Sequence, residues 1–167
     1  MKGCKDKFYD SKFNEKINTN LDLIGLNNCV IDLKHQVGDE TKIMFREGIP
    51  DDFITISMGY ELPIERGDLP MSYEEVFNNI KDKQVDNEFT QLGLDLDDFF
   101  LKVLPYEDVR EYTLRFLSSC LSGEVTEHKF YMWTGSGGNG KSLLVKLLQH
   151  TLGDYSKTFP NLLSQNQ

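Results

Sequence analysis

The sequence lacks several features that would point to particular classes of protein. No apolar run approaches the roughly 20 residues of a membrane-spanning helix. Residues 1–7 are not followed by the apolar stretch of a secretory signal. The three cysteines, Cys4, Cys29 and Cys120, have no C-x-x-C spacing, which indicates free thiols in a reducing compartment rather than disulfides or a zinc site. We therefore expect a protein that is not secreted and has no membrane partner.

Basic charge is also scarce. The chain has 18 Lys and Arg residues against 27 Asp and Glu residues, which gives a net charge of −9. This balance argues against a stand-alone nucleic-acid-binding domain, because such domains are usually basic on at least one face. The acids concentrate between residues 51 and 111, where solvated helix faces and helix starts account for them. The three histidines fall in no metal-ligand spacing. Neither the acids nor the histidines therefore predict a catalytic or metal site.

A phosphate-binding loop motif is present near the C-terminal end. Residues 135–142 read GSGGNGKS, which matches G-x-x-x-x-G-K-[ST]. Before it, the aromatic-rich residues 129–134 predict a strand. After it, leucines at helical spacing predict a helix over residues 141–152, ended by Gly153. The predicted nucleotide-binding residues are Gly135, Ser136, Gly137, Gly138, Asn139, Gly140, Lys141 and Ser142.

Each residue type in this loop has a chemical reason. Glycines allow positive φ angles, so that several backbone N–H groups can converge on one anion. The following helix adds its unpaired N–H groups and the positive end of its dipole. Lys141, the predicted catalytic residue, would neutralise the β- and γ-phosphates, and the Ser142 hydroxyl would ligate Mg²⁺. The predicted cofactors are ATP and Mg²⁺.

Three alternatives compete with this interpretation. Residues 135–140 also spell G-x-G-x-x-G, but a dinucleotide fold expects an acid roughly 20 positions further on, and residues 158–162 read TFPNL. A protein-kinase loop would continue into a strand, whereas a helical pattern follows here. The third alternative is a glycine-rich surface turn that fits by chance. The flanking strand and helix patterns favour the phosphate loop.

The remaining sequence divides near residue 123. Residues 1–123 predict a small α+β module with a hairpin turn at Asn27 and Asn28, followed by helices. Ser72 and Glu75 have the spacing of a capping box at the start of one helix. The expected strands lie near residues 21–26, 29–33, 42–46 and 53–60, and the expected helices cover residues 7–18, 72–83, 95–104 and 107–121.

Residues 124–167 predict the first strand–loop–helix unit of an α/β phosphate-loop NTPase core. Such a core needs a second strand that ends in Asp or Glu to organise Mg²⁺ and the attacking water. Neither residues 154–167 nor residues 54–59 supply one. The expectation is therefore half of an active site, in a fragment of a larger protein or a truncated form of one.

Three segments together resemble a known family. They are residues 23–33 (LIGLNNCVIDL), residues 45–60 (FREGIPDD through SMGY), and residues 116–155 from FLSSCLSG through the loop to LGDY. Across residues 8–167 the chain resembles the poxvirus-type primase–helicases of large DNA viruses, some phages and plasmids. The resemblance covers their helicase-associated N-terminal domain and the start of their superfamily-three helicase core.

The resemblance implies an ATP-hydrolysing, homo-hexameric DNA helicase with an AAA+-like core. It would act in viral DNA replication inside the host cell, in the cytoplasm or a viral factory. The family's acidic motif, polar sensor and arginine finger do not occur in this sequence, so the chain alone is expected to be inactive. The alternative is a nucleotide-binding or protein-interaction module that acts through residues 1–123. An unrelated phosphate-loop enzyme, such as a phosphotransferase, would rest on the loop alone.

Overall fold

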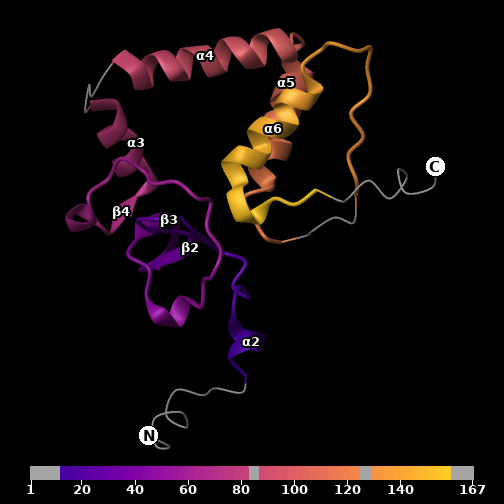
Figure 1. The fold of residues 1–167 in the computed structure, drawn as a ribbon. Helices are drawn as coiled ribbons and strands as arrows, with labels where there is room; N and C mark the ends of the chain where they lie inside the picture. Colours follow the sequence, from indigo (N-terminus) through magenta and orange to yellow (C-terminus); the bar gives the residue numbers. More distant parts are fainter. Residues whose placement is uncertain (1–11, 83–86, 125–128, 159–167) are drawn as a thin grey trace, which may run out of the picture.

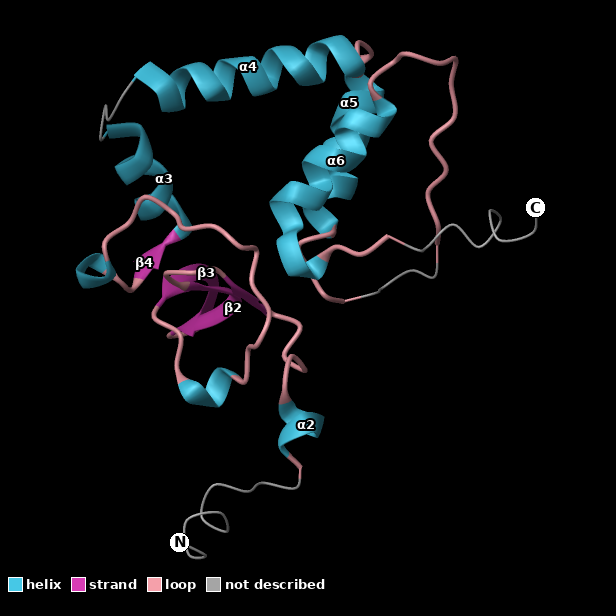
Figure 2. Ribbon diagram, in the orientation of Figure 1, coloured by secondary structure: helices cyan, strands magenta, loops and turns pink. Residues whose placement is uncertain are grey.

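The computed structural model describes residues 12–82, 87–124 and 129–158 (Figure 1). Figure 2 shows a small sheet, with most of the helical structure following it in the sequence. The elements in chain order are α2 (Phe13–Lys16), β1 (Leu23–Gly25), β2 (Val30–Val37), β3 (Glu40–Arg46), η1 (Pro50–Asp52), η2 (Arg66–Asp68), β4 (Met71–Ser72), α3 (Tyr73–Asp82), α4 (Asn87–Val103), α5 (Glu107–Ser119), α6 (Lys141–Leu152) and η3 (Gly153–Tyr155). The predicted α+β class is confirmed.

The sheet is antiparallel, with strand order β1-β2-β3-β4. The predicted hairpin at Asn27 and Asn28 is confirmed, because Gly25 pairs with Val30 and the Leu26 N–H donates to the Cys29 carbonyl at 2.9 Å. A second hairpin joins β2 to β3. The first three strands therefore bond to neighbours that are close in sequence, which keeps loop closure inexpensive. Residues 47–70 separate β4 from its partner β3.

The strand predicted over residues 53–60 does not form. The segment runs beside β1 and makes only scattered backbone bonds to it, such as that from the Met58 N–H to the Gly25 carbonyl at 2.9 Å. Two of its other N–H groups donate to side chains instead: that of Thr55 to Asn18 Oδ1 at 2.8 Å and that of Ser57 to Asp154 Oδ2 at 3.2 Å. Side-chain acceptors thus replace the strand ladder that the sequence pattern predicted.

The predicted helices are confirmed with changed limits. The capping box at α3 forms in both directions: the Glu75 N–H donates to Ser72 Oγ at 3.3 Å, and the Ser72 N–H donates to Glu75 Oε2 at 2.7 Å. Helix α4 begins at Asn87 rather than at residue 95. Gln91 Nε2 donates to Asp95 Oδ1 at 2.8 Å. This bond links residue 95, where the helix was predicted to begin, to the helical turn that precedes it. Within the helix predicted over residues 7–18, the structure shows α2 alone among the described residues. Residues 7–11 lie outside the described residues.

Two apolar clusters form the core. One lies between the sheet and α3 and consists of Leu26, Cys29, Phe45, Ile64 and Val76. The other joins the sheet to the end of α6 through Ile24, Met58 and Leu152. The predicted domain boundary near residue 123 stays a prediction, but α6 shares this second cluster with β1.

The chain just after α6 is fastened to the sheet. Gly153 has φ +52°, and a Cβ there would lie 2.3 Å from the Met58 carbonyl oxygen, so only glycine fits. The Asp154 N–H donates to the Ser57 carbonyl at 3.0 Å. The Gly25 N–H donates to the Tyr155 hydroxyl at 2.8 Å, and burial is the main reason that the pKa of this hydroxyl is raised. One end of α6 is therefore held by β1 and the segment beside it.

Candidate nucleotide-binding site

The segment before the loop, residues 129–134, is irregular rather than the predicted strand. A strand needs a neighbour for its backbone hydrogen bonds, and every strand in the described part of the chain pairs within the antiparallel sheet. Aromatic packing on α5 takes the place of pairing. The Tyr131 ring centroid lies 3.9 Å from that of Phe116, and the Trp133 ring meets Phe116 edge-on at 6.3 Å.

The loop leads directly into α6, as predicted. Gly140 has φ +79° and is the cap residue of the helix, and the N–H groups of Leu143 and Leu144 both donate to its carbonyl at 3.0 Å. A Cβ at Gly140 would lie 2.6 Å from Val103 Cγ2, so glycine is required by its backbone angle and by its neighbour. The first turn of α6 is thereby seated against the end of α4.

Lys141 turns back over the loop. Its ammonium lies 3.3 Å from the carbonyl oxygens of Gly135 and Ser136 and 2.5 Å from Asn139 Oδ1. Neutral carbonyl oxygens are weaker partners for an ammonium than a charged oxyanion is. Lys141 would therefore gain a stronger partner if a phosphate oxygen replaced these carbonyl oxygens.

Ser142, the predicted Mg²⁺ ligand, is exposed in the first turn of α6. Magnesium is usually bound by few protein oxygens and keeps several waters, so one hydroxyl beside phosphate oxygens fits this chemistry. No cluster of three or more His, Cys, Asp or Glu residues suited to a metal occurs among the described residues. Ser142 would therefore be one ligand in a set completed by phosphate and water.

A cavity of about 1030 Å³ opens beside the loop, and we call it the loop cavity. Its described lining comprises residues 102–106 at the α4–α5 corner, Val109, Tyr112 and Thr113 on α5, residues 129–134, and Asn139, Lys141 and Leu144. The sequence predicted Asn139 and Lys141 here but gave no signal for the α4–α5 corner. That contribution depends on a tertiary contact between Val103 and Gly140, which no local pattern encodes.

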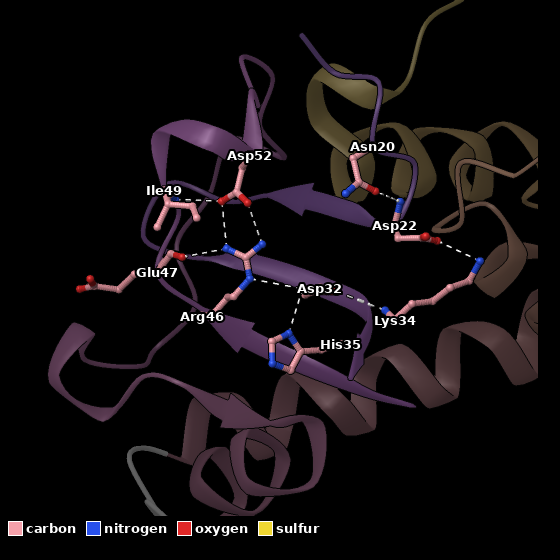
Figure 3. A network of polar contacts seen from close by, with 9 residues as sticks. All are labelled: Asn20, Asp22, Asp32, Lys34, His35, Arg46, Glu47, Ile49 and Asp52. Atoms are coloured by element: carbon pink, nitrogen blue, oxygen red, sulfur yellow. Dashed lines mark hydrogen bonds and ion pairs between the residues drawn. The ribbon is translucent and has the colours of Figure 1, made fainter. Parts of the chain in front are cut away.

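A polar cluster lies on the sheet (Figure 3). Arg46 donates two bonds to the Asp52 carboxylate, at 2.8 and 2.9 Å, and one to Asp32 at 3.3 Å. The Arg46 guanidinium is the main cause of the lowered pKa of Asp52. His35 Nδ1 lies 3.1 Å from Asp32 Oδ2, the same oxygen that accepts from Arg46. The cluster fastens η1 to β2 and β3, which is a structural role.

Comparison with known proteins gives three viral relatives. The chain is 38% identical over 158 residues, 94% of its length, to "Putative helicase L207/L206" of Acanthamoeba polyphaga mimivirus. It is 28% identical to "Putative helicase 184R" of Invertebrate iridescent virus 6 over 96% of its length, and 24% identical to "Putative helicase 121R" of Invertebrate iridescent virus 3 over 92%. These similarities support a viral helicase family.

The match to this viral helicase family includes both the sheet and the loop, since it covers more than nine-tenths of the chain in each case. The chain spans only 13–14% of the length of these relatives. No protein-family model and no solved structure matches the chain. None of the helices in the described part of the chain is both long and apolar enough to cross a bilayer.

Proposed function

We propose that the chain is part of an ATP-dependent DNA helicase of the primase–helicase type, built on a superfamily-three core, and that residues 135–142 bind the phosphates of ATP. The observation that carries this proposal is the loop that runs directly into α6, with Lys141 and Ser142 in the first helical turn. The similarity to viral proteins named as helicases supports it. By this proposal the complete protein is a homo-hexamer that acts on DNA inside the infected cell.

The roles follow from the chemistry of the residues present. Backbone N–H groups of residues 136–142 and the dipole of α6 would hold the phosphates. Lys141 would move from the loop carbonyls to the β- and γ-phosphates, and Ser142 would contribute a hydroxyl to Mg²⁺. Bound Mg²⁺ would neutralise charge that develops on the phosphates.

This proposal assigns phosphate binding, and not hydrolysis, to the described residues. The described residues that line the loop cavity include no carboxylate that could organise the metal or the attacking water. The same observation favours a second candidate function, a module that binds nucleotide or another protein without turnover. Both candidate functions use the nucleotide site, and they differ in whether the bound ATP is hydrolysed.

Titration of the chain with ATP and Mg²⁺ in a calorimeter tests the proposal. The Lys141→Ala variant is expected to bind ATP about 10- to 100-fold more weakly, because it loses hydrogen bonds between charged groups worth about 1.5–3 kcal/mol. Lys146→Ala is the matched control, since it removes the same charge from an exposed position on α6 and should leave the affinity unchanged. Equal losses in both variants, or no binding by the wild type, would refute the phosphate site. Multiple turnover by the isolated chain would refute the inactive module.

A further inference from the structure

The loop cavity has an aromatic wall, formed by Tyr106, Tyr112 and Trp133, that phosphate binding does not use. Tyr106, Val109 and Tyr112 follow one another at intervals of three residues from the start of α5, so they share one face of the helix. All three line the cavity, and each has an exposed side chain. Trp133 lines it from residues 129–134. Two aromatic surfaces therefore border the space that begins at Lys141.

The charge of the lining selects an anionic occupant. Its charged members among the described residues are Lys102, Lys129 and Lys141, with no Asp or Glu, although the whole chain carries a net charge of −9. Lys102 also pairs with Asp98 on α4. A neutral or basic peptide would gain little from this lining, whereas a phosphorylated aromatic compound matches both the cations and the rings.

The size and position of the cavity fit one nucleotide. Pockets for small ligands measure roughly 300–1,000 Å³, and this cavity of about 1030 Å³ lies just above that range, so it has room for a whole nucleotide. Asn139 and Lys141 line it together with the α4–α5 corner. A nucleotide with its terminal phosphates in the loop would therefore extend its sugar and base along the aromatic wall.

We propose that the loop cavity binds the ribose and purine base of the nucleotide, with the base stacked on Tyr112 and Trp133. The inference rests on the proposed phosphate site and extends it to the remainder of the ligand. The lining offers rings for stacking and few fixed polar groups, so selection is by the larger stacking surface of a purine and not by base-edge hydrogen bonds. ATP and GTP should therefore bind alike, and both should bind more tightly than CTP and UTP.

The test compares ATP with inorganic tripolyphosphate, each with Mg²⁺, on the 167-residue chain. Trp133 is the single tryptophan, so its fluorescence reports on the cavity directly. ATP should quench this emission and bind more tightly than tripolyphosphate. Stacking on one aromatic residue corresponds to about 5- to 150-fold in affinity. Tyr112→Ala should therefore lower the affinity for ATP by about tenfold and leave the affinity for tripolyphosphate unchanged. Tyr112→Phe should behave as the wild type.

Tyr73→Ala is the matched control, because Tyr73 is an exposed tyrosine on α3 outside the cavity lining. Equal affinities for ATP and tripolyphosphate, both lost in Lys141→Ala, would overturn the base site and leave the phosphate site intact. Failure of both ligands to bind would instead remove the phosphate site. Equal affinities for all four nucleoside triphosphates would overturn purine selection. Displacement of ATP by a single-stranded oligothymidylate at similar concentration would reassign the aromatic wall to nucleic acid.

Discussion

The sheet and the loop region are organised by different kinds of interaction. The sheet pairs strands that are neighbours in sequence and buries Leu26, Cys29 and Phe45 against α3. Residues 129–134 have no strand partner among the described residues, and Phe130 and Met132 are 84% and 73% exposed. The first three strands of the sheet pair across short turns, whereas the loop depends on contacts with distant parts of the chain.

The difference shows that α6 positions the loop together with the aromatic packing of residues 129–134 on α5. Gly140 seats the first turn of α6 against Val103, and Gly153 seats the chain after its last turn against Met58. The loop thus begins a helix whose two ends are held by different elements. Variants that release one end of α6 should affect nucleotide binding, whereas variants within the sheet should affect stability alone.

The largest effect is expected from Gly153→Ala. The new methyl group would lie 2.3 Å from the Met58 carbonyl oxygen, at a residue with φ +52°. Overpacking and a left-handed non-glycine residue each cost about 1–3 kcal/mol, so the free energy of unfolding should fall by about 2–6 kcal/mol. Urea denaturation measures this loss, and hydrogen exchange should locate it in α6.

Gly67→Ala is the control for this prediction. A Cβ at Gly67 meets no atom within 4 Å, so the urea midpoint should stay close to that of the wild type. If Gly153→Ala also left the midpoint and the exchange rates of α6 unchanged, α6 would not be held at Met58. The loop would then have to be positioned by the Val103 contact and by the aromatic packing on α5.

An intermediate effect is expected in the sheet from Asp52→Asn. The Asp52 side chain is only 8% exposed and pairs with Arg46 at 2.8 Å, and hydrogen bonds to charged groups are worth about 1.5–3 kcal/mol. The free energy of unfolding at pH 7 should fall by about this amount. Asp51→Asn, at the exposed neighbouring position, should have little effect.

The pH dependence of this pair has a definite sign. Arg46 lowers the folded-state pKa of Asp52, so the pair stabilises the fold fully above the unfolded-state value of about 3.9. That stability is lost as the pH falls below this value and through the folded-state pKa. Acid titration of the wild type should therefore show a loss of stability that is absent in Asp52→Asn. Parallel acid curves for the two proteins would contradict the assigned shift.

The sequence correctly predicted the structural features that depend on residues close to one another in the chain. The turn at Asn27 and Asn28, the capping box at Ser72, and the limits of α6 all involve residues within a few positions of one another. The failed predictions concern residues 53–60 and residues 129–134, whose strand-like composition says nothing about partners. Thr55 and Ser57 found side-chain acceptors on Asn18 and Asp154, about 40 and 100 positions away along the chain, which no periodicity encodes.

The candidate site likewise has one part that the sequence predicted and another part that depends on contacts between distant residues. Residues 135–142 are contiguous, so their motif was readable without a structure, although their function stays a prediction. The aromatic wall is assembled from α5 with its cap residue and from residues 129–134. The sequence predicted a helix over residues 107–121, which includes Tyr112, but only the placement of the loop beside Tyr112 suggests a ligand.

The smallest effect should come from Ser72→Ala, and it separates the two regions most cleanly. Loss of a helix cap costs about 1 kcal/mol, and Ser72 Oγ accepts the Glu75 N–H at the start of α3. Ser72→Asp keeps an acceptor and should recover most of the stability. Because α3 lines no part of the loop cavity, the affinity for ATP should be the same in both variants, measured by the same calorimetric titration. Weaker ATP binding by Ser72→Ala would mean that the sheet and the loop respond as one unit.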